Sequence, residues 1–249
     1  MKSVLFKHRS IRKFRPTPIP AEVLRECLEA ATRASTCGNM QLYSLVVTRD
    51  AALRERLSPC HFNQPIVREA PCVVTVCADV HRFSQWCEQR EAEPAYDNFA
   101  WFLNAATDAL LAAQNLCIEA ELHGLGICYL GTTIYTAGEI AQVLELPKGV
   151  IPVTTIVMGY PAETPGLTDR LPLEAVVHYE KYTDYTAAEI DELWAEREES
   201  DETKRLLEEN GLPNLARIFT ERRYVRRDNL AISQSYLALL REKGFFNND

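Results

Sequence analysis

Apolar residues in the first 160 positions of the chain follow two different spacings. Helical spacing over 19–34, 51–57 and 136–146 predicts three helices. Runs rich in β-branched and aromatic residues predict strands, and these runs lie at 42–48, 72–78, 127–130 and 150–159. This order of elements predicts an α/β sandwich, in which helices cover both faces of a central sheet.

The segment 96–123 predicts the longest helix of the chain. It contains no Gly or Pro, and apolar residues fall on almost every side of it, which is typical of a helix buried all round. At a rise of about 1.5 Å per residue such a helix is roughly 40 Å long. Because a small domain cannot wrap that length alone, we expect a partner subunit to cover one face. Polar residues within it, including Asp108 and Glu119, exclude a membrane span.

The character of the chain changes after Pro161. Further prolines interrupt regular structure, and from Ala187 onward the chain is highly charged with a helical pattern that ends in amphipathic spacing at Ile232, Tyr236 and Leu239. The apolar content of 161–249 is thin for an independent core. We therefore predict a single domain over 1–249, with a core at 1–160 and an extension at 161–249 that clasps the core or the partner subunit.

Composition places the chain among ordinary globular proteins, with 47% apolar and 25% charged residues. A net charge of −8 argues against nucleic acid as a partner, because binding phosphates requires a basic surface. The eight cysteines form no CxxC pair and no histidine is spaced to complete a zinc site, so we expect no metal. Cysteines in apolar runs suit a reducing compartment, and the N-terminus lacks a signal-peptide pattern. We expect a cytoplasmic protein with no membrane partner.

Three clusters of residues are candidates for binding chemistry. Residues 8–14, HRSIRKF, offer two guanidinium forks that fit a phosphate or a ring carbonyl. Residues 36–41, TCGNMQ, combine small and amide side chains that allow close approach to a flat ligand. The third cluster pairs residues 129–132 with 169–172, which include Arg170 in an irregular segment. Taken singly, each cluster is equally compatible with a surface turn, a helix-ending loop or a solvated arginine.

Familiar nucleotide and catalytic motifs are missing. Gly124-x-Gly126 is followed by Tyr129 where the dinucleotide-binding fingerprint needs glycine. The sequence has no phosphate-binding GxxxxGK[ST] loop, no GxSxG elbow and no HExxH motif. A redox cofactor would therefore have to be held in another way.

The clusters gain specificity from their order along the chain. HRSIRKF, NMQ, the helical DALLAAQNL, GLGICYLG, and MGYPAE followed by DRLP occur in that sequence. In this the chain resembles the nitroreductase family, and within it the NADPH-linked flavin reductase and oxygen-insensitive nitroreductase subgroup. The resemblance covers residues 1–180 and continues more loosely to the C-terminus. It implies an α+β fold that binds FMN, with a central mixed but mainly antiparallel sheet flanked by helices, in an intertwined homodimer.

The resemblance also assigns cofactor contacts by position. The matching residues are His8, Arg9, Ser10, Arg12, Thr36, Cys37, Gly38, Asn39, Gln41, Gln64, Tyr129, Leu130, Gly131 and Arg170. Residues 8–12 match the opening flavin motif, with Arg12 expected beside the ring, where a cation stabilises reduced flavin. Gln64 matches a glutamine that reaches the ring, and Arg170 matches a late phosphate-binding arginine. Residues 36–41 match a loop that the other subunit contributes.

The activity implied by the resemblance is ping-pong hydride transfer from NADPH or NADH, through FMN, to nitroaromatics, quinones or free flavin. No side chain is then required as a catalytic nucleophile or base. Lys204 and Arg205 are candidates to bind the 2′-phosphate of NADPH, but the surrounding segment is acidic, so the preference between NADPH and NADH stays open. The family also often has a lysine where this chain has Thr168. The alternatives are a dehalogenase-like or flavin-fragmenting relative, and a flavin-binding protein without turnover.

Overall fold

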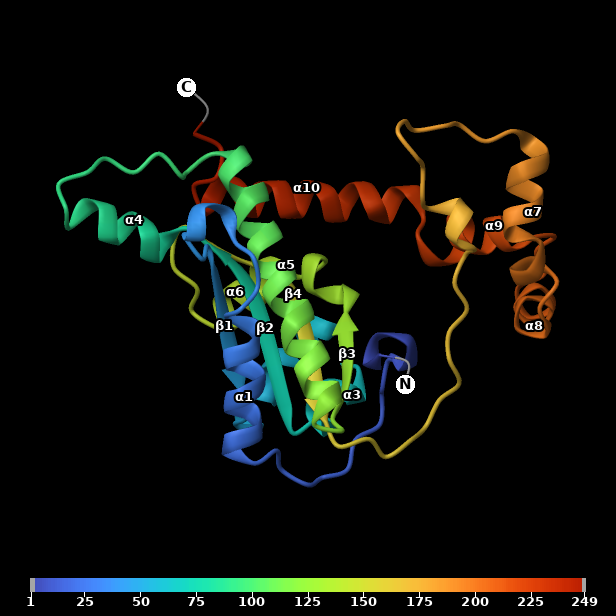
Figure 1. Ribbon diagram of the computed structural model, residues 1–249, viewed down its shortest axis with the longest axis horizontal. Coiled ribbons are helices and arrows are strands. Elements are labelled where there is room, and N and C mark those ends of the chain that lie inside the picture. Colours follow the sequence, from blue (N-terminus) through green and yellow to red (C-terminus); the bar gives the residue numbers. More distant parts are fainter. Residues whose placement is uncertain (1–2, 248–249) are drawn as a thin grey trace. The chain divides into compact units, whose positions relative to one another are not determined.

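The computed structural model describes residues 3–247, and its centre is a four-stranded sheet (Figure 1). The strands are β1 (Tyr43–Thr48), β2 (Cys72–Asp79), β3 (Gly126–Leu130) and β4 (Val150–Gly159), arranged in the order β1-β2-β4-β3. All three neighbouring pairs are antiparallel. One isolated parallel bridge joins Ser10 to Ile127. The predicted α+β fold with a mainly antiparallel sheet is confirmed.

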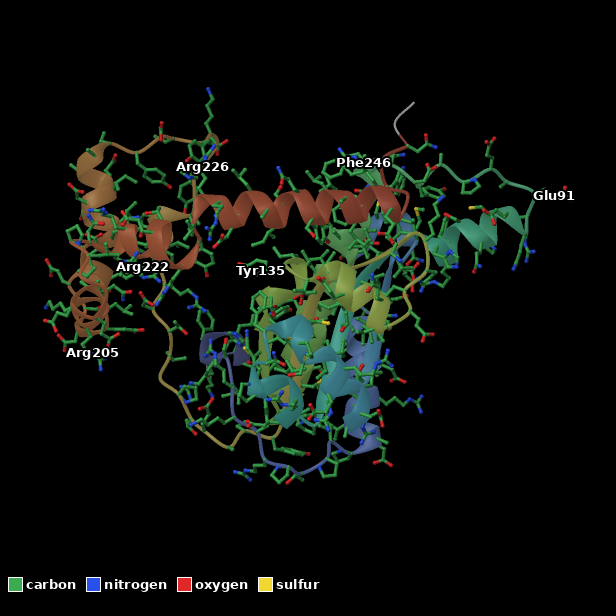
Figure 2. The ribbon with its side chains drawn as sticks, turned by 180° about the vertical axis from the view of Figure 1, so that it is seen from behind. Glu91, Tyr135, Arg205, Arg222, Arg226 and Phe246 are labelled. Atoms are coloured by element: carbon green, nitrogen blue, oxygen red, sulfur yellow. The ribbon has the colours of Figure 1, made fainter. Side chains whose placement is uncertain are left out.

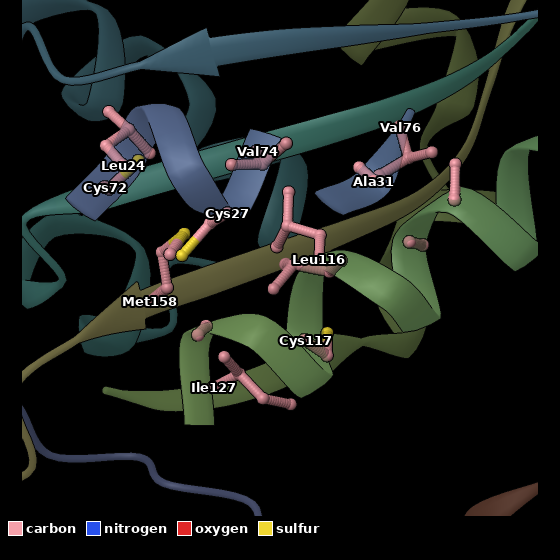
Figure 3. Packing of buried hydrophobic residues seen from close by; sticks show 14 of the residues in the cluster. Leu24, Cys27, Ala31, Cys72, Val74, Val76, Leu116, Cys117, Ile127 and Met158 are labelled. Carbon is pink, nitrogen blue, oxygen red and sulfur yellow. The ribbon is translucent and has the colours of Figure 1, made fainter. Parts of the chain in front are cut away.

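Helices cover both faces of this sheet, as the sequence pattern predicts. Along the fully buried β2, Cys72, Val74 and Val76 pack with α1 (Ala21–Ala31) and α5 (Phe99–Leu122) on one face (Figure 3). The alternate residue Val73 packs on the other face. That face is covered by α2 (Ala51–Leu57), α3 (Pro65–Glu69) and α6 (Ala137–Val143). The period-2 alternation of a strand therefore supplies both cores.

Helix α5 buries one side against the sheet and keeps large apolar residues exposed on another. Asn98 caps its N-terminus, because its side chain accepts a hydrogen bond from the backbone N–H of Trp101. The face packed on the sheet consists largely of alanines, which allow close approach. Large apolar residues exposed along the helix are Phe99, Leu103, Leu110, Leu111 and Leu122. The helix that was expected to be buried on all sides is therefore incompletely covered within one chain.

The chain divides into two units. The first comprises the chain up to Gly166 together with the chain from Ile232 onward, and the second comprises 167–231. In the first unit, α4 (His81–Glu88) follows β2, and the later part of α10 (Arg226–Glu242) packs Leu239 and Leu240 against α5. The second unit contains α7 (Ala187–Glu198), α8 (Asp201–Asn210), α9 (Leu215–Ile218) and a π-helix (Phe219–Arg223). The prediction of one domain with a core at 1–160 stays a prediction.

Short 3₁₀ helices connect several elements: η1 (Val4–Lys7), η2 (Cys37–Asn39), η3 (Pro59–His61), η4 (Gly131–Ile134) and η5 (Leu173–Ala175). Three predicted helices are shorter than expected. The helix predicted at 136–146 ends at Val143, because Glu145 adopts a left-handed φ of 54° and Pro147 follows. The helix predicted at 19–34 ends at Ala31, and that at 96–123 begins at Phe99 after its Asn98 cap. Within residues 3–247, every helix is too short or too polar to span a bilayer.

Candidate functional site

The arginine-bearing N-terminal segment runs beside the end of the sheet. The backbone N–H of Ile11 donates to the carbonyl of Ile127 in β3 at 2.9 Å, and Ser10 forms a parallel bridge with the same residue. Further along, the N–H of Arg15 donates to the carbonyl of Tyr160 at 2.8 Å, just after β4. Residues 8–14 are therefore held against β3, the strand that carries Tyr129 and Leu130 of the third candidate cluster.

Two glycines make this approach possible. Gly126 and Gly159 lie opposite each other where β3 pairs with β4. A Cβ on Gly126 would lie 2.5 Å from Cγ1 of Ile11, and a Cβ on Gly159 would lie 2.6 Å from Cδ of Pro71. Neither space can hold a side chain, so glycine is required here for close backbone approach.

The polar groups of this segment differ in their hydrogen-bond partners. Nδ1 of His8 lies 2.6 Å from a carboxylate oxygen of Glu121 near the end of α5. The carboxylate of Glu163 accepts the backbone N–H groups of Arg12 and Lys13 at 2.7 and 3.1 Å, and the side chain of Arg12 is exposed. Arg9 is half-buried, and its Nε is shielded from solvent without a hydrogen-bond partner in the described chain. A buried donor of this kind calls for an acceptor, which fits an anionic or carbonyl-bearing cofactor.

A buried histidine joins the Gln64 loop to the end of β3. His61 is fully buried, and its Nδ1 lies 2.7 Å from the hydroxyl of Thr132 in η4. The hydroxyl of Thr136 donates to the carbonyl of Cys60, which ties the same two segments together a second time. Gln64 and Gly131, which the resemblance places at one cofactor, thus belong to loops that are fixed to each other.

Burial sets the protonation states in this region. It lowers the pKa of His61 to about 4, so the imidazole is neutral at neutral pH. The pKa of the Tyr129 phenol is raised, first by burial and then by the neighbouring Cys117 thiol, so the hydroxyl keeps its proton. Neither group carries charge near pH 7, and the charge available to a ligand here comes from Arg9 and Arg12.

A buried carboxylate shapes the loop at 36–41. Asp108 of α5 is 1% exposed, and its two oxygens accept the backbone N–H groups of Cys37 at 2.9 Å and Leu42 at 3.1 Å. Between these anchors, Gly38, Asn39 and Gln41 all have left-handed φ values of 54° to 56°. The carbonyl of Gln41 also accepts a hydrogen bond from the guanidinium of Arg82. Cys37, Gly38 and Asn39 are exposed on this constrained turn, and Thr36 is half-buried beside it.

The two halves of the predicted site are attached at different points of α5. His8 is held at Glu121, whereas the loop at 36–41 is held at Asp108. Thirteen residues separate these anchors, which corresponds to roughly 20 Å along a helix. Within a single chain, the residues at 8–12 and 36–41 therefore have separate supports at distant positions on α5.

The other predicted residues lie in the second unit. Arg170 is exposed in an irregular segment, and its guanidinium donates to the carbonyl of Asp169 at 2.8 Å. Lys204 and Arg205 lie on α8 and are both exposed, and Arg205 is labelled in Figure 2. Their assignments to the cofactor and to the 2′-phosphate stay predictions.

Sequence reasoning missed the residues that hold the loops. Asp108, His61 and Glu163 each bind backbone or side chains far away in the sequence. One signal was visible for Asp108, because an aspartate within the alanine-rich DALLAA stretch of a buried helix needs hydrogen-bond donors. His61 and Glu163 lie in irregular segments whose sequence gives no comparable signal.

Comparisons with known proteins agree with this architecture. Residues 5–160 match the Nitroreductase family. The chain is 35% identical over 180 residues to an FMN reductase (NADPH) of Bacillus subtilis (strain 168), an alignment that covers 72% of each protein. A crystal structure of a putative oxidoreductase from Bacteroides fragilis superimposes with a TM-score of 0.96 at 50% identity, covering 98% of this chain and 99% of that one. The NfrA1 nitroreductase of B. subtilis gives a TM-score of 0.79 at 30% identity, covering 98% of both chains.

The family match extends over more than half of the chain and includes β1 to β4 together with the arginine segment that lies beside them. The relative from B. subtilis matches at an identity above 30% over most of both proteins. By sequence and by fold, the chain belongs to the nitroreductase family.

Proposed function

We propose that this protein is an FMN-dependent NAD(P)H oxidoreductase that reduces nitroaromatics, quinones or free flavin. The observation that carries the proposal is the unsatisfied, shielded Nε of Arg9, which lies with the exposed Arg12 in the N-terminal segment held against β3. An otherwise acidic chain concentrates cationic donors here. Relatives named FMN reductase (NADPH) and NADPH-dependent oxidoreductase support the same activity.

The residues proposed to hold FMN come from both supports on α5. His8, Arg9, Ser10 and Arg12 form one group, with Gln64 and the turn at 129–131 fixed nearby through His61. The loop at 36–41 forms the other group. Because roughly 20 Å of helix separates the two anchors, we propose that one cofactor takes the first group from one subunit and the second group from its partner. A homodimer is the arrangement that satisfies both assignments.

Bound FMN supplies the hydride acceptor and donor, and the protein positions it. Arg9 and Arg12 provide donors for phosphate or ring oxygens. The constrained turn at 36–41 presents backbone and small side chains to a flat ligand. His61 is neutral and the Tyr129 phenol keeps its proton, so neither side chain adds charge next to the proposed cofactor. None of these groups is required to act as a nucleophile or a general base.

Several finer assignments belong to the same proposal. Arg170 is proposed as a second phosphate ligand, and Lys204 and Arg205 as contacts for the 2′-phosphate of NADPH; the side chains of all three are exposed to solvent. A cytoplasmic location is proposed because all eight cysteines are free thiols.

The test measures cofactor content and turnover together. Purified protein is expected to contain FMN and to oxidise NADPH or NADH when a quinone or a nitroaromatic compound is supplied. Arg12→Ala should weaken FMN binding about 10- to 100-fold, the loss expected for one charge-assisted contact, and should lower the flavin reduction potential. Arg25→Ala is the matched control, because Arg25 is exposed on α1, away from the proposed cofactor residues, and pairs with Glu29.

The outcomes separate the alternatives. Protein that takes up no FMN would refute the proposal. Protein that binds FMN but oxidises neither nicotinamide with any acceptor would be a flavin-binding protein without turnover. Dehalogenation or flavin cleavage by the loaded protein would indicate one of the specialised activities. Unchanged FMN affinity and potential in Arg12→Ala would remove Arg12 from the site while leaving the overall function intact.

A further inference from the structure

A second cluster of titratable side chains lies outside the proposed cofactor residues, where α1 packs on α5. Glu26 comes from α1, and Glu119 and His123 come from the end of α5, one helical turn apart. Nε2 of His123 lies 2.9 Å from a carboxylate oxygen of Glu26 and 3.2 Å from one of Glu119. The three potential ligand atoms all lie within 4.8 Å of one another.

The contacts within this cluster are close without being hydrogen bonds. Nε2 of His123 is shielded from solvent, and it has no hydrogen-bond partner despite the two nearby carboxylates. An imidazole nitrogen that forms an ordinary ion pair would direct its N–H at one oxygen. Here the nitrogen lies close to both carboxylate oxygens without that alignment. A cation bound between the three atoms would account for their proximity.

No basic side chain in the described chain compensates the two carboxylates. The neighbouring Arg25 forms an ion pair with Glu29 on the same helix, and Glu121 is paired with His8. The ion pairs of Glu26 and Glu119 within residues 3–247 involve His123 alone. The cluster is thus an uncompensated negative site with one imidazole.

We propose that Glu26, Glu119 and His123 bind a divalent transition-metal ion of the zinc class. One imidazole nitrogen and two carboxylate oxygens are ligands that Zn²⁺ accepts, at about 2.0–2.2 Å from each. Two such ligands around a tetrahedral ion lie roughly 3.3–3.6 Å apart, so the separations of 2.9 and 3.2 Å found here need to widen by only a few tenths of an ångström to admit the ion. With three protein ligands, a fourth position is left for water.

The position of the site determines what the ion does. It joins α1 to α5, and α1 leads directly into the constrained turn at 36–41. An ion that binds the folded chain but not the unfolded one stabilises the fold. The role assigned is therefore structural: the ion secures the helix pair that supports this turn, and it takes no part in hydride transfer.

The experiment titrates Zn²⁺ into chelator-treated, FMN-loaded protein by isothermal titration calorimetry. We expect one site per chain and a rise in melting temperature on Zn²⁺ addition. His123→Ala should reduce the affinity by at least about 10-fold, since even outer partners of a metal site contribute that much. Glu26→Gln, at an exposed position on α1, should reduce it in the same direction with little risk to folding.

Two control variants define the result. His81→Ala removes an imidazole at the start of α4, and Glu29→Gln removes a carboxylate that is exposed on α1 and pairs with Arg25. Both should bind Zn²⁺ as the parent protein does. A flat isotherm would overturn the proposal and leave the packing of α1 on α5 as the explanation for the proximity of His123 to the two carboxylates. Equal binding in His123→Ala, Glu26→Gln and the parent would also overturn it, because the ion would then lie elsewhere.

Discussion

At the scale of single residues, His61 links pH to stability. Its pKa is lowered from 6.5 to about 4 by burial, so the unfolded chain binds a proton in a pH range where the folded chain does not. The free energy of unfolding is therefore highest above pH 6.5, where neither state binds this proton. It decreases progressively as the pH falls from 6.5 toward 4, because the unfolded chain is protonated first. Between pH 7 and pH 5 this one group should remove about 2 kcal/mol from the free energy of unfolding.

The variant His61→Asn tests this contribution. An asparagine can retain the hydrogen bond to Thr132 that Nδ1 makes, but it does not titrate. Urea unfolding at pH 7 and pH 5 should show a smaller loss of stability in the variant than in the parent, by about 2 kcal/mol. Equal losses in both proteins would show that His61 is accessible to protons in the folded state.

Residues that hold the site were harder to predict than residues expected to touch the cofactor. Arg9, Arg12 and Gln41 stand in short motifs whose order along the chain identifies the family. Asp108 binds Cys37, and His61 binds Thr132; in each pair the partners are 71 residues apart in the sequence. No local sequence pattern can indicate a contact over such a separation. The Glu119–His123 pair was visible at helical spacing, but its third member, Glu26, is brought to it only by packing of α1 on α5.

At the scale of elements, the contact between the N-terminal segment and β3 depends on Gly126. In Gly126→Ala the new methyl group would collide with Ile11, 2.5 Å away, so the segment that carries Arg9 and Arg12 must shift. We expect a loss of about 1–3 kcal/mol in the free energy of unfolding, typical of overpacking, together with weaker FMN retention. Chemical denaturation and the FMN content of the purified variant measure the two effects.

A second glycine provides the matched control. Gly138 lies in helix α6 and has open space where a Cβ would stand. Gly138→Ala should therefore be neutral or stabilise by up to about 1 kcal/mol, because alanine favours the helix. If Gly126→Ala behaved like Gly138→Ala, the N-terminal segment would not be held against β3 as described.

Strands were predicted more closely than helix ends. The limits of β4 coincide with the predicted 150–159, and β1 and β2 differ from the prediction by one residue. Continuous apolar runs with abrupt polar ends mark such strands. Helix limits depend instead on capping residues and on residues with a left-handed φ, such as Glu145. The spacing of apolar residues does not indicate either feature. Helices α3 and α4 were not predicted, because Pro65–Glu69 is very short and His81–Glu88 is largely polar.

At the scale of the whole molecule, the exposed face of α5 is the feature that one chain leaves incomplete. Leu103, Leu110 and Leu111 are each 44–50% exposed in the middle of the long helix α5. The proposed division of the cofactor site between two supports on the same helix also favours a second copy. The sequence pattern predicted that a partner would cover α5, and the exposed leucines specify which face is available.

Leu110→Glu tests that face directly. A carboxylate introduced into an apolar subunit interface loses its hydration without gaining a partner, which costs several kcal/mol, whereas on a free surface the change is nearly neutral. Multi-angle light scattering should therefore report a dimer for the parent and a monomer for Leu110→Glu, and the monomer should retain little FMN because the turn at 36–41 of the other copy is lost. Ala52→Glu adds the same charge on the exposed side of α2, across the sheet, and should stay dimeric and loaded with FMN. A Leu110→Glu protein that is dimeric and fully loaded would place the subunit contact elsewhere, and a parent protein that is monomeric with stoichiometric FMN would remove the need for two copies altogether.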